Sequence, residues 1–234
     1  MKLKFLGTKG EIEEESPKHK YNSSLLITEK NFKLLIDHGF LSKKLSKIRP
    51  GAILITHGHP DHFVWLKEDE DYQGKIYLTS ETEKAAKFKK NFVIIKVNHW
   101  FKVGPFKIFA YKVAHSLIAP AVGYKIKNSK TLIYNPDLIV MKGKNVLKDV
   151  DLYIGDGSSV RSNLVRRRDS QLFGHTRMTT QINWCRKFGI TKVIFTHLGK
   201  EALKIGDKKL EKMLAQENMN VKIAYDGMVR ELDQ

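Results

Sequence analysis

The chain has 234 residues, 41% of them hydrophobic and 29% charged, and its 42 Lys and Arg against 25 Asp and Glu give a net charge of +17. No apolar run approaches the ~18 residues that a membrane-spanning helix needs, and the N-terminus lacks the apolar core of a secretory signal. The lone Cys185 excludes an internal disulfide framework and fits a reducing compartment. We therefore expect one cytoplasmic domain over residues 1–234 with no membrane contact.

Strands are predicted wherever an apolar run of strand length is bounded by turn residues. In chain order they cover 3–8, two strands within 22–39 joined by a turn at 29–31, then 52–56, 75–80, 92–97, 106–113, 121–127, 129–137, 150–157, 190–197 and 220–227. Helices are predicted at 42–48, from about Ser80, and most clearly near 179–188 and 207–217. With no repeat, low-complexity tract or linker in between, we expect an α/β fold of many strands with a few outer helices.

Candidate metal ligands recur where the predicted strands end. The motif HGHPDH (57–62) follows the buried strand 52–56, and His115, Asp137, Asp156 and His197 each follow a later strand. In layered α/β folds the carboxyl ends of strands converge on one edge, where loops build the active site. Side chains far apart in the sequence are therefore expected to meet there.

Seven nitrogen and oxygen ligands suffice for two divalent metal ions. A thiol-free set rich in histidine favours Zn²⁺, with Mn²⁺ or Fe²⁺ as alternatives. Two such ions can bridge a hydroxide that attacks a phosphoryl or acyl group. The competing interpretation is a polar loop with incidental histidines, which becomes hard to maintain when all of them lie at strand ends. The candidate ligands are His57, His59, Asp61, His62, His115, Asp137 and His197.

The motif H-x-H-x-D-H after a buried strand, matched at every specified position by residues 57–62, resembles the hallmark of the metallo-β-lactamase superfamily. The stretch LLIDHG (34–39) resembles the first motif of that superfamily, so the resemblance covers nearly the whole chain. It implies a four-layer αββα sandwich. It also implies that Asp37 orients a ligand imidazole from behind, although an Asp that only caps the turn at Gly39 would occupy the same place. The implied division of ligands is His57, His59 and His115 on one metal, Asp61, His62 and His197 on the other, and Asp137 bridging.

Within the superfamily the chain resembles ribonuclease Z and related phosphodiesterases. The stretch HSLIAPAVGY (115–124) resembles their histidine followed by Gly-Tyr, and GHTRMT (174–179) resembles their box with a histidine ahead of the last ligand. The box implies that His175 is catalytic, stabilising charge on the departing oxygen or protonating it. The segment between Asp137 and His175 is too short for the long tRNA-binding arm of ribonuclease Z. A single-stranded nucleic acid, a cyclic nucleotide or a cyclic phosphate is therefore the expected substrate.

The excess of positive charge predicts a polyanionic partner, although scattered lysines are often only solvated surface. Two clusters add weight to the prediction: Lys84 and Lys87 lie one helical turn apart, and 166–168 is a run of three arginines in a predicted loop. Arginine binds phosphate as a planar fork. We therefore expect a phosphate-containing substrate, with nucleic acid as one option. The sequence leaves the oligomeric state open, and a homodimer is one option. The candidate substrate-binding residues in this loop are Arg166, Arg167 and Arg168.

Other side chains near the motifs have two interpretations each. Asp61 is expected to hold the attacking hydroxide as well as a metal. Phe63 and Trp65 either wall the mouth of the site and stack a base, or pack in the core. Tyr124 is a further candidate for substrate binding, and Asp156 in the stretch GDGS is more typical of a turn.

Three classes of function stay open. The first is a dinuclear-metal phosphodiesterase or nuclease. The second is a hydrolase of carbon esters, lactones, thioesters or β-lactams on the same scaffold. The third is a nucleic-acid-binding or scaffolding protein with a vestigial site. The complete ligand set argues against the third class, and the positive charge together with His175 favours the first.

Overall fold

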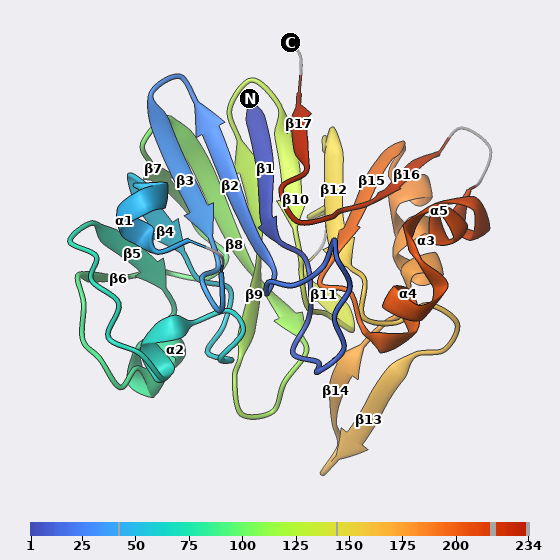
Figure 1. Ribbon diagram of the computed structural model, residues 1–234, viewed down its shortest axis with the longest axis horizontal. Coiled ribbons are helices and arrows are strands. Elements are labelled where there is room, and N and C mark those ends of the chain that lie inside the picture. Colours follow the sequence, from blue (N-terminus) through green and yellow to red (C-terminus); the bar gives the residue numbers. More distant parts are fainter. Residues whose placement is uncertain (42, 144, 216–218, 233–234) are drawn as a thin grey trace.

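The computed structural model describes residues 1–41, 43–143, 145–215 and 219–232. Two β-sheets pack face to face, and helices cover the outer side of each (Figure 1). The predicted helix at 42–48 is found only as α1 (Leu45–Ile48), and its first residue, Ser42, lies outside the described residues. No helix among the described residues is long and apolar enough to cross a membrane.

The first sheet has seven strands in the order β17-β1-β2-β3-β4-β5-β6. Strands β3, β4, β5 and β6, which make up one half of the sheet, run parallel, while β1 and β2 form antiparallel pairs. The outer side carries α1, α2 (Ser80–Ala85) and a 3₁₀ turn, η1 (Val64–Leu66). The strands are β1 (Lys2–Gly7), β2 (Ser24–Glu29), β3 (Phe32–Ile36), β4 (Ala52–Leu54), β5 (Lys75–Leu78), β6 (Phe92–Ile94) and β17 (Val229–Glu231).

The second sheet has eight strands, seven in the order β11-β8-β9-β10-β12-β15-β16 and β7 paired to β8. Strands β10, β12, β15 and β16 are parallel. Strand β9 is antiparallel to both β8 and β10, so β8 points the same way as β10. The strands are β7 (Trp100–Val103), β8 (Phe106–Ala114), β9 (Ala121–Lys127), β10 (Thr131–Tyr134), β11 (Val140–Lys142), β12 (Leu152–Asp156), β15 (Lys192–Thr196) and β16 (Asn220–Ile223).

Three hydrophobic clusters separate four layers. The largest lies between the sheets and joins residues such as Phe5 and Leu54 of the first sheet to Phe106 and Ile154 of the second. A second cluster joins the outer side of the second sheet to α3 (Met178–Lys187), α4 (Lys200–Ile205) and α5 (Asp207–Leu214). The third lies under α1 and η1. This is the αββα sandwich that the sequence predicts, and Cys185 packs inside the second cluster.

A two-stranded hairpin, β13 (Leu164–Arg168) and β14 (Gln171–His175), stands apart from both sheets. In Figure 1 it projects at the lower edge, below β12. The prediction of a loop for the run of three arginines is therefore wrong: Arg166–Arg168 pair in antiparallel register with Gln171–Phe173. The alternation of apolar and polar residues is too weak there to reveal strands, because both faces of the hairpin meet water.

Parallel register places the ends of the site-bearing strands together. Strands β4, β8, β10, β12 and β15 all end at the lower edge of the sandwich in Figure 1. Four of them are short apolar runs buried on both faces, whereas the nine-residue β8 alternates buried and exposed side chains, and each leads into polar residues of the site. The fold therefore delivers the loops after these strands to one place.

Candidate metal centre and active-site cleft

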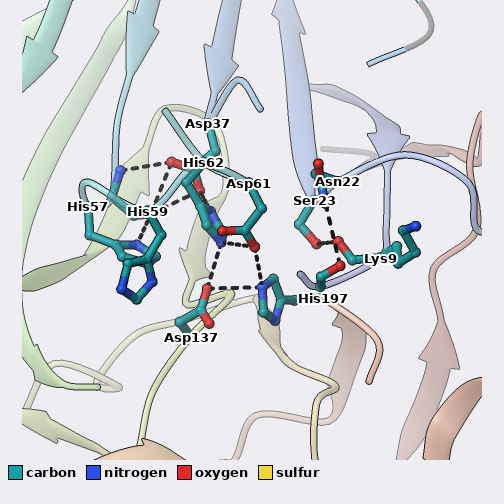
Figure 2. A network of polar contacts seen from close by, with 12 residues as sticks. Lys9, Asn22, Ser23, Asp37, His57, His59, Asp61, His62, Asp137 and His197 are labelled. Carbon is teal, nitrogen blue, oxygen red and sulfur yellow. Dashed lines mark hydrogen bonds and ion pairs between the residues drawn. The ribbon is translucent and has the colours of Figure 1, made fainter. Parts of the chain in front are cut away.

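The seven predicted ligands lie together at this edge, as Figure 2 shows for six of them. Four ligands come from the loop after β4, and the other three come from the loops after β8, β10 and β15. Six of the seven are buried, whereas His59 is partly exposed. The structure therefore brings together residues that are up to 140 positions apart in the numbering, between 57 and 197.

Three imidazoles form the first group. The Nδ1 atom of His59 lies 2.9 Å from Nε2 of His57 and 3.4 Å from Nε2 of His115. These nitrogens lie within 4.8 Å of one another, a spacing at which one metal ion can bind all three. His59 therefore presents Nδ1 and the other two present Nε2.

The second group combines carboxylates with imidazoles. Oδ2 of Asp61 lies 3.1 Å from Nε2 of His62 and 3.0 Å from Nε2 of His197. Asp137 stands between the groups: its Oδ2 is 2.9 Å from Nε2 of His62, and its Oδ1 is 3.6 Å from Nε2 of His115. This is the position that a bridging carboxylate requires.

Two atoms at the centre of the cluster test whether metal fits. Nε2 of His62 and Oδ2 of Asp137 are both buried, yet neither makes a hydrogen bond of acceptable geometry. Buried polar atoms without a partner are costly, and a metal ion satisfies them as ligands. The donor set of imidazoles and carboxylates without a thiolate is typical of divalent transition metals. The residues present therefore fit divalent metal.

Electrostatics prepare the ligands for a cation. Burial opposes ionisation of Asp61 and Asp137, but the neighbouring imidazoles outweigh it and hold both carboxyl pKa values well below the usual range. Burial, aided by the charge of His62, lowers the pKa of His57 and keeps its imidazole neutral. Ionised carboxylates and neutral imidazoles are the forms that bind metal, so a metal ion would displace the proton of His62, whose pKa the Asp61 carboxylate raises against the effect of burial.

Each buried ligand imidazole is fixed by a partner on its far nitrogen. Nδ1 of His62 donates to Asp37 at 2.9 Å, and Nδ1 of His115 donates to the Gly174 carbonyl at 3.2 Å. Such partners select the tautomer and point the free nitrogen at the metal. Asp37 thus lies where the sequence predicts, behind the ligands, and the alternative of a mere turn cap at Gly39 does not describe its contacts.

Two hydroxyls do the same for His57 and His197, and sequence reasoning missed both. Thr56 Oγ donates to Asp37 at 3.0 Å, so its oxygen accepts from Nδ1 of His57 at 3.0 Å. Ser158 Oγ donates to the His197 carbonyl at 3.0 Å and accepts from Nδ1 of the same residue at 2.8 Å. Nothing in the sequence marks Ser158, since it lies 39 positions from its partner.

The backbone bends sharply at two of these residues. Asp37 has φ = 59° and His197 has φ = 55°, a left-handed conformation that non-glycine residues rarely adopt. Both lie directly after a buried strand, β3 and β15, and the bend turns the side chain into the cluster. Strain of this kind is typical of functional sites that the surrounding structure over-determines.

His175, the last residue of β14, lies beside the ligands. Its Nδ1 is 2.7 Å from Oδ2 of Asp156 and 3.6 Å from Oδ1 of Asp137, and its ring stacks against that of His197 at 5.8 Å. Burial disfavours the imidazolium, but the Asp156 carboxylate outweighs it and raises the pKa of His175 to about 9. A metal ion at the neighbouring ligands acts in the opposite direction.

Asp156 is therefore more than the turn residue that its sequence context indicates. It is fully buried, and its carboxylate accepts the backbone N–H of Leu138 at 3.0 Å and that of Ser158 at 2.8 Å. Only the meeting of β12 with the hairpin reveals its contact with His175.

The cluster opens into a cleft of about 650 Å³. The loop after β1 forms one wall with Gly10 and Ile12, and Leu164 at the start of the hairpin forms another. A Cβ on Gly10 would approach the His197 ring to 3.0 Å, so a larger residue there would have to displace the loop or the ring by a few tenths of an ångström. Lys200 and Lys204 of α4 add positive charge at the rim, although Lys200 pairs with Glu14.

Some predicted substrate contacts do not lie in this cleft. Tyr124 is fully buried, and its hydroxyl donates to the Ile55 carbonyl at 2.6 Å, so the prediction that it binds substrate is wrong. Phe63 and Trp65 are core residues of the third cluster and do not wall the mouth. All three arginines of β13 are exposed on the hairpin and do not line the cleft. The hairpin begins at the edge of the cleft, where Leu164 is a lining residue.

Four layers with a cluster of histidines and aspartates at one edge, able to hold metal, define a protein of the metallo-β-lactamase fold. A family model described as a beta-lactamase superfamily domain matches residues 41–198, more than half of the chain. The chain therefore belongs to the β-lactamase superfamily, whose members are metal-dependent hydrolases.

Solved structures share the fold at low identity. The metallo-β-lactamase fold protein YhfI from Bacillus subtilis is 19% identical with a TM-score of 0.75, over 98% of both chains. A diphosphatase of the PhnP family is 15% identical with a TM-score of 0.70, over 98% of this chain and 96% of its own. The short form of human tRNase Z is 16% identical with a TM-score of 0.64, over the whole of both chains.

The same fold also supports other chemistry. An isothiocyanate hydrolase from Delia radicum gut bacteria is 13% identical with a TM-score of 0.66, over 99% of both chains. The curated proteins contain no significant match to the sequence. The fold therefore identifies the superfamily without choosing between phosphorus and carbon as the atom attacked.

Proposed function

We propose that the chain is a phosphodiesterase dependent on two divalent metal ions, for which the ligand chemistry favours zinc, and that it acts on a nucleic acid strand or on a cyclic nucleotide or cyclic phosphate. The observation that carries the proposal is the pair formed by His175 and Asp156 beside the ligand cluster. Cleavage of a phosphodiester expels an alkoxide, a poor leaving group that needs charge stabilisation or a proton.

Two metal ions at this site would supply a water of lowered pKa and Lewis-acid stabilisation of phosphoryl oxygens. His57, His59 and His115 would hold one ion, and Asp61, His62 and His197 the other, with Asp137 shared. Asp37, Thr56, Ser158 and the Gly174 carbonyl keep the imidazoles oriented whether or not substrate is bound.

His175 contributes from outside the ligand groups. Asp156 engages its Nδ1, so Nε2 is the nitrogen that remains for the cleft. Because the carboxylate favours the imidazolium, His175 can donate a hydrogen bond to a phosphoryl oxygen or pass a proton to the departing oxygen. Since His115, Asp137 and His175 also lie within ligand distance of one another, metal analysis of a His175 variant separates this role from ligation.

Charge supports the same substrate class. Some basic side chains lie near the cleft: Lys204 lines it, and the arginines of β13 follow the lining residue Leu164 on the hairpin. Phosphodiester anions are attracted to such a surface, and arginine binds their oxygens as a fork. The hairpin β13–β14 is much shorter than the tRNA-binding arm of ribonuclease Z. We therefore propose that substrates smaller than a folded RNA fit the site best.

A hydrolase of carbon esters, lactones or thioesters is the second candidate. The apolar side chains of Ile12 and Leu164 at the cleft walls favour it, because they offer no charge to a phosphate. The same ligand cluster would also activate water for attack on a carbonyl carbon.

A substrate panel on metal-reconstituted protein tests the two candidates. The panel contains bis-p-nitrophenyl phosphate, 2′,3′- and 3′,5′-cyclic nucleotides, short oligonucleotides, a lactone and a thioester. We expect turnover of at least one phosphodiester and its loss on chelation. Turnover of the lactone or thioester at a higher kcat/KM than every phosphodiester would contradict the proposal and favour the second candidate.

A further inference from the structure

The outer face of β7, β8 and β9 carries an ordered set of cationic and aromatic side chains. Register pairs Lys102 with Lys107 and Lys107 with Lys127, so three lysines form one row across three strands. The adjacent row begins with Trp100 paired to Phe109. Side chains directly opposite one another on a sheet are about 5 Å apart, so the lysine row and the aromatic row form neighbouring lines on a flat surface.

The aromatic row is open to solvent at Trp100, whereas Phe109 is partly buried. Trp100 is 52% exposed, and its ring lies 5.3 Å from that of Phe109. A shallow hollow of about 530 Å³ is lined by the lysine row together with Trp100 and Phe101. An exposed indole is unusual, because burying a Trp side chain is among the largest hydrophobic gains available to a chain. Trp65, by contrast, is fully buried.

The charge of the lysine row is not compensated within the described part of the chain. Lys102, Lys107 and Lys127 take part in none of the ion pairs found there. Their neighbour Lys125 differs, because its amine donates to the backbone carbonyls of Val146 and Lys148. The charge of Asp149, which follows these two carbonyls in the chain, favours the ammonium form of Lys125. The lysine row itself therefore consists of positive charges alone.

We infer that this face, the Trp100 face (Trp100, Phe109, Lys102, Lys107 and Lys127), is a non-catalytic binding surface for single-stranded nucleic acid. The indole offers a platform on which an unpaired base stacks, and the lysine row neutralises the phosphates that run beside it. An anionic membrane would also be attracted to lysine and tryptophan. It favours a helix or a loop that can enter the lipid interface, whereas these residues lie flat on a sheet.

The Trp100 face lies away from the candidate active site. Phe109 precedes His115 by six positions along β8, roughly 20 Å at ~3.3 Å per residue. In Figure 1, β7 lies at the upper left and the hairpin β13–β14 at the lower edge. A strand bound at the Trp100 face therefore leaves the cleft free, and its binding can be measured separately from hydrolysis.

Fluorescence anisotropy with a fluorescein-labelled oligodeoxythymidine of about 12 nucleotides tests the inference on metal-reconstituted protein, with strand integrity checked on gels. Trp100→Ala should weaken binding about 10-fold, the loss typical of one stacked base, while Trp100→Phe should retain most of the affinity. Replacing Lys102, Lys107 and Lys127 by Ala should weaken binding and reduce the slope of log K against log salt by about 2.

The matched control replaces the three exposed lysines of α5 (Lys208, Lys209 and Lys212) by Ala, an identical change in net charge on a distant element. This control should weaken binding much less than the Trp100-face triple. An equal loss in both triples, or unchanged affinity in Trp100→Ala, would overturn the inference. A second experiment measures sedimentation of the protein with phosphatidylserine vesicles. Sedimentation that depends on Trp100, together with oligonucleotide binding that does not, would replace the nucleic-acid surface by a membrane surface.

Hydrolysis of bis-p-nitrophenyl phosphate separates this inference from the proposed function. All of these variants should hydrolyse it as the unmodified chain does, because none of the substituted residues lines the cleft. Trp100-dependent binding without any hydrolysis would leave the binding surface standing and contradict the phosphodiesterase. Hydrolysis without Trp100-dependent binding would contradict the binding surface and leave the phosphodiesterase standing.

Discussion

Nδ1 of His175 lies 2.7 Å from Oδ2 of Asp156, where the last residue of the hairpin strand β14 meets the last residue of β12. The carboxylate is itself held by the backbone N–H groups of Leu138 and Ser158. His175 is thereby fixed at the rim of the ligand cluster in one orientation. This contact orders the His175 ring beside the cluster, as the proposed catalytic role requires.

Metal content is the first prediction. The protein should bind about two equivalents of divalent metal per chain, because three imidazoles form one group of ligands, Asp61, His62 and His197 form another, and Asp137 lies between them. Elemental analysis after reconstitution with Zn²⁺ and dialysis gives the measurement. His59→Ala should reduce the content and abolish hydrolysis. A metal-free protein that hydrolyses its substrates as fast as the reconstituted one would contradict the whole account.

His175→Ala should lower turnover of a phosphodiester by about 10²–10⁴-fold, the usual contribution of a general acid. The loss should be largest for poor leaving groups and nearly vanish for p-nitrophenolate, which departs without a proton. Steady-state kinetics over a series of leaving groups gives the measurement. Both metals should remain. Loss of metal would make His175 a ligand, and an equal loss for all leaving groups would exclude proton donation.

Asp156→Asn should act through His175 as a positioning change. It should lower kcat with little change in KM. The alkaline limb of the kcat profile should move to lower pH, because Asp156 raises the pKa of His175 and its removal lets the imidazolium lose its proton earlier. In a His175→Ala background the same substitution should cost almost nothing. A full additional loss there would assign Asp156 an independent role.

Ser158→Ala should weaken metal binding by about 10–100-fold, because Nδ1 of His197 loses the oxygen that orients it. Competition with a chromophoric chelator measures the affinity. Ser129→Ala, at an exposed turn, is the matched control and should leave it unchanged. Unchanged affinity in the Ser158 variant would show that the loop after β15 holds His197 without help.

Replacing Arg166, Arg167 and Arg168 together by Ala should weaken oligonucleotide binding and flatten its salt dependence. Hydrolysis of a small phosphodiester should change little, because these side chains do not line the cleft. Equal loss on both substrates would show that the hairpin positions His175 through its strand pairing. No loss on either would make the arginines ordinary surface.

The sequence by itself determined most of the strands, though not the hairpin β13–β14, and which residues could bind metal. Apolar runs of strand length followed by His or Asp are local patterns, and the dense HGHPDH motif (57–62) needs no tertiary information to be recognised. The carboxyl ends of parallel strands must share an edge, so the grouping of His115, Asp137 and His197 with this motif follows from elementary geometry.

Only the tertiary structure decided what surrounds these residues. Ser158 and Asp156 are short polar side chains after a strand, and their partners lie on other elements, so no local pattern separates them from turn residues. Burial likewise decided against Tyr124, because a tyrosine after Gly looks the same in sequence whether its hydroxyl meets substrate or the Ile55 carbonyl. Pairing across β7, β8 and β9 aligned Trp100 with lysines distant in the chain, since strand register depends on contacts that the sequence of one strand does not contain.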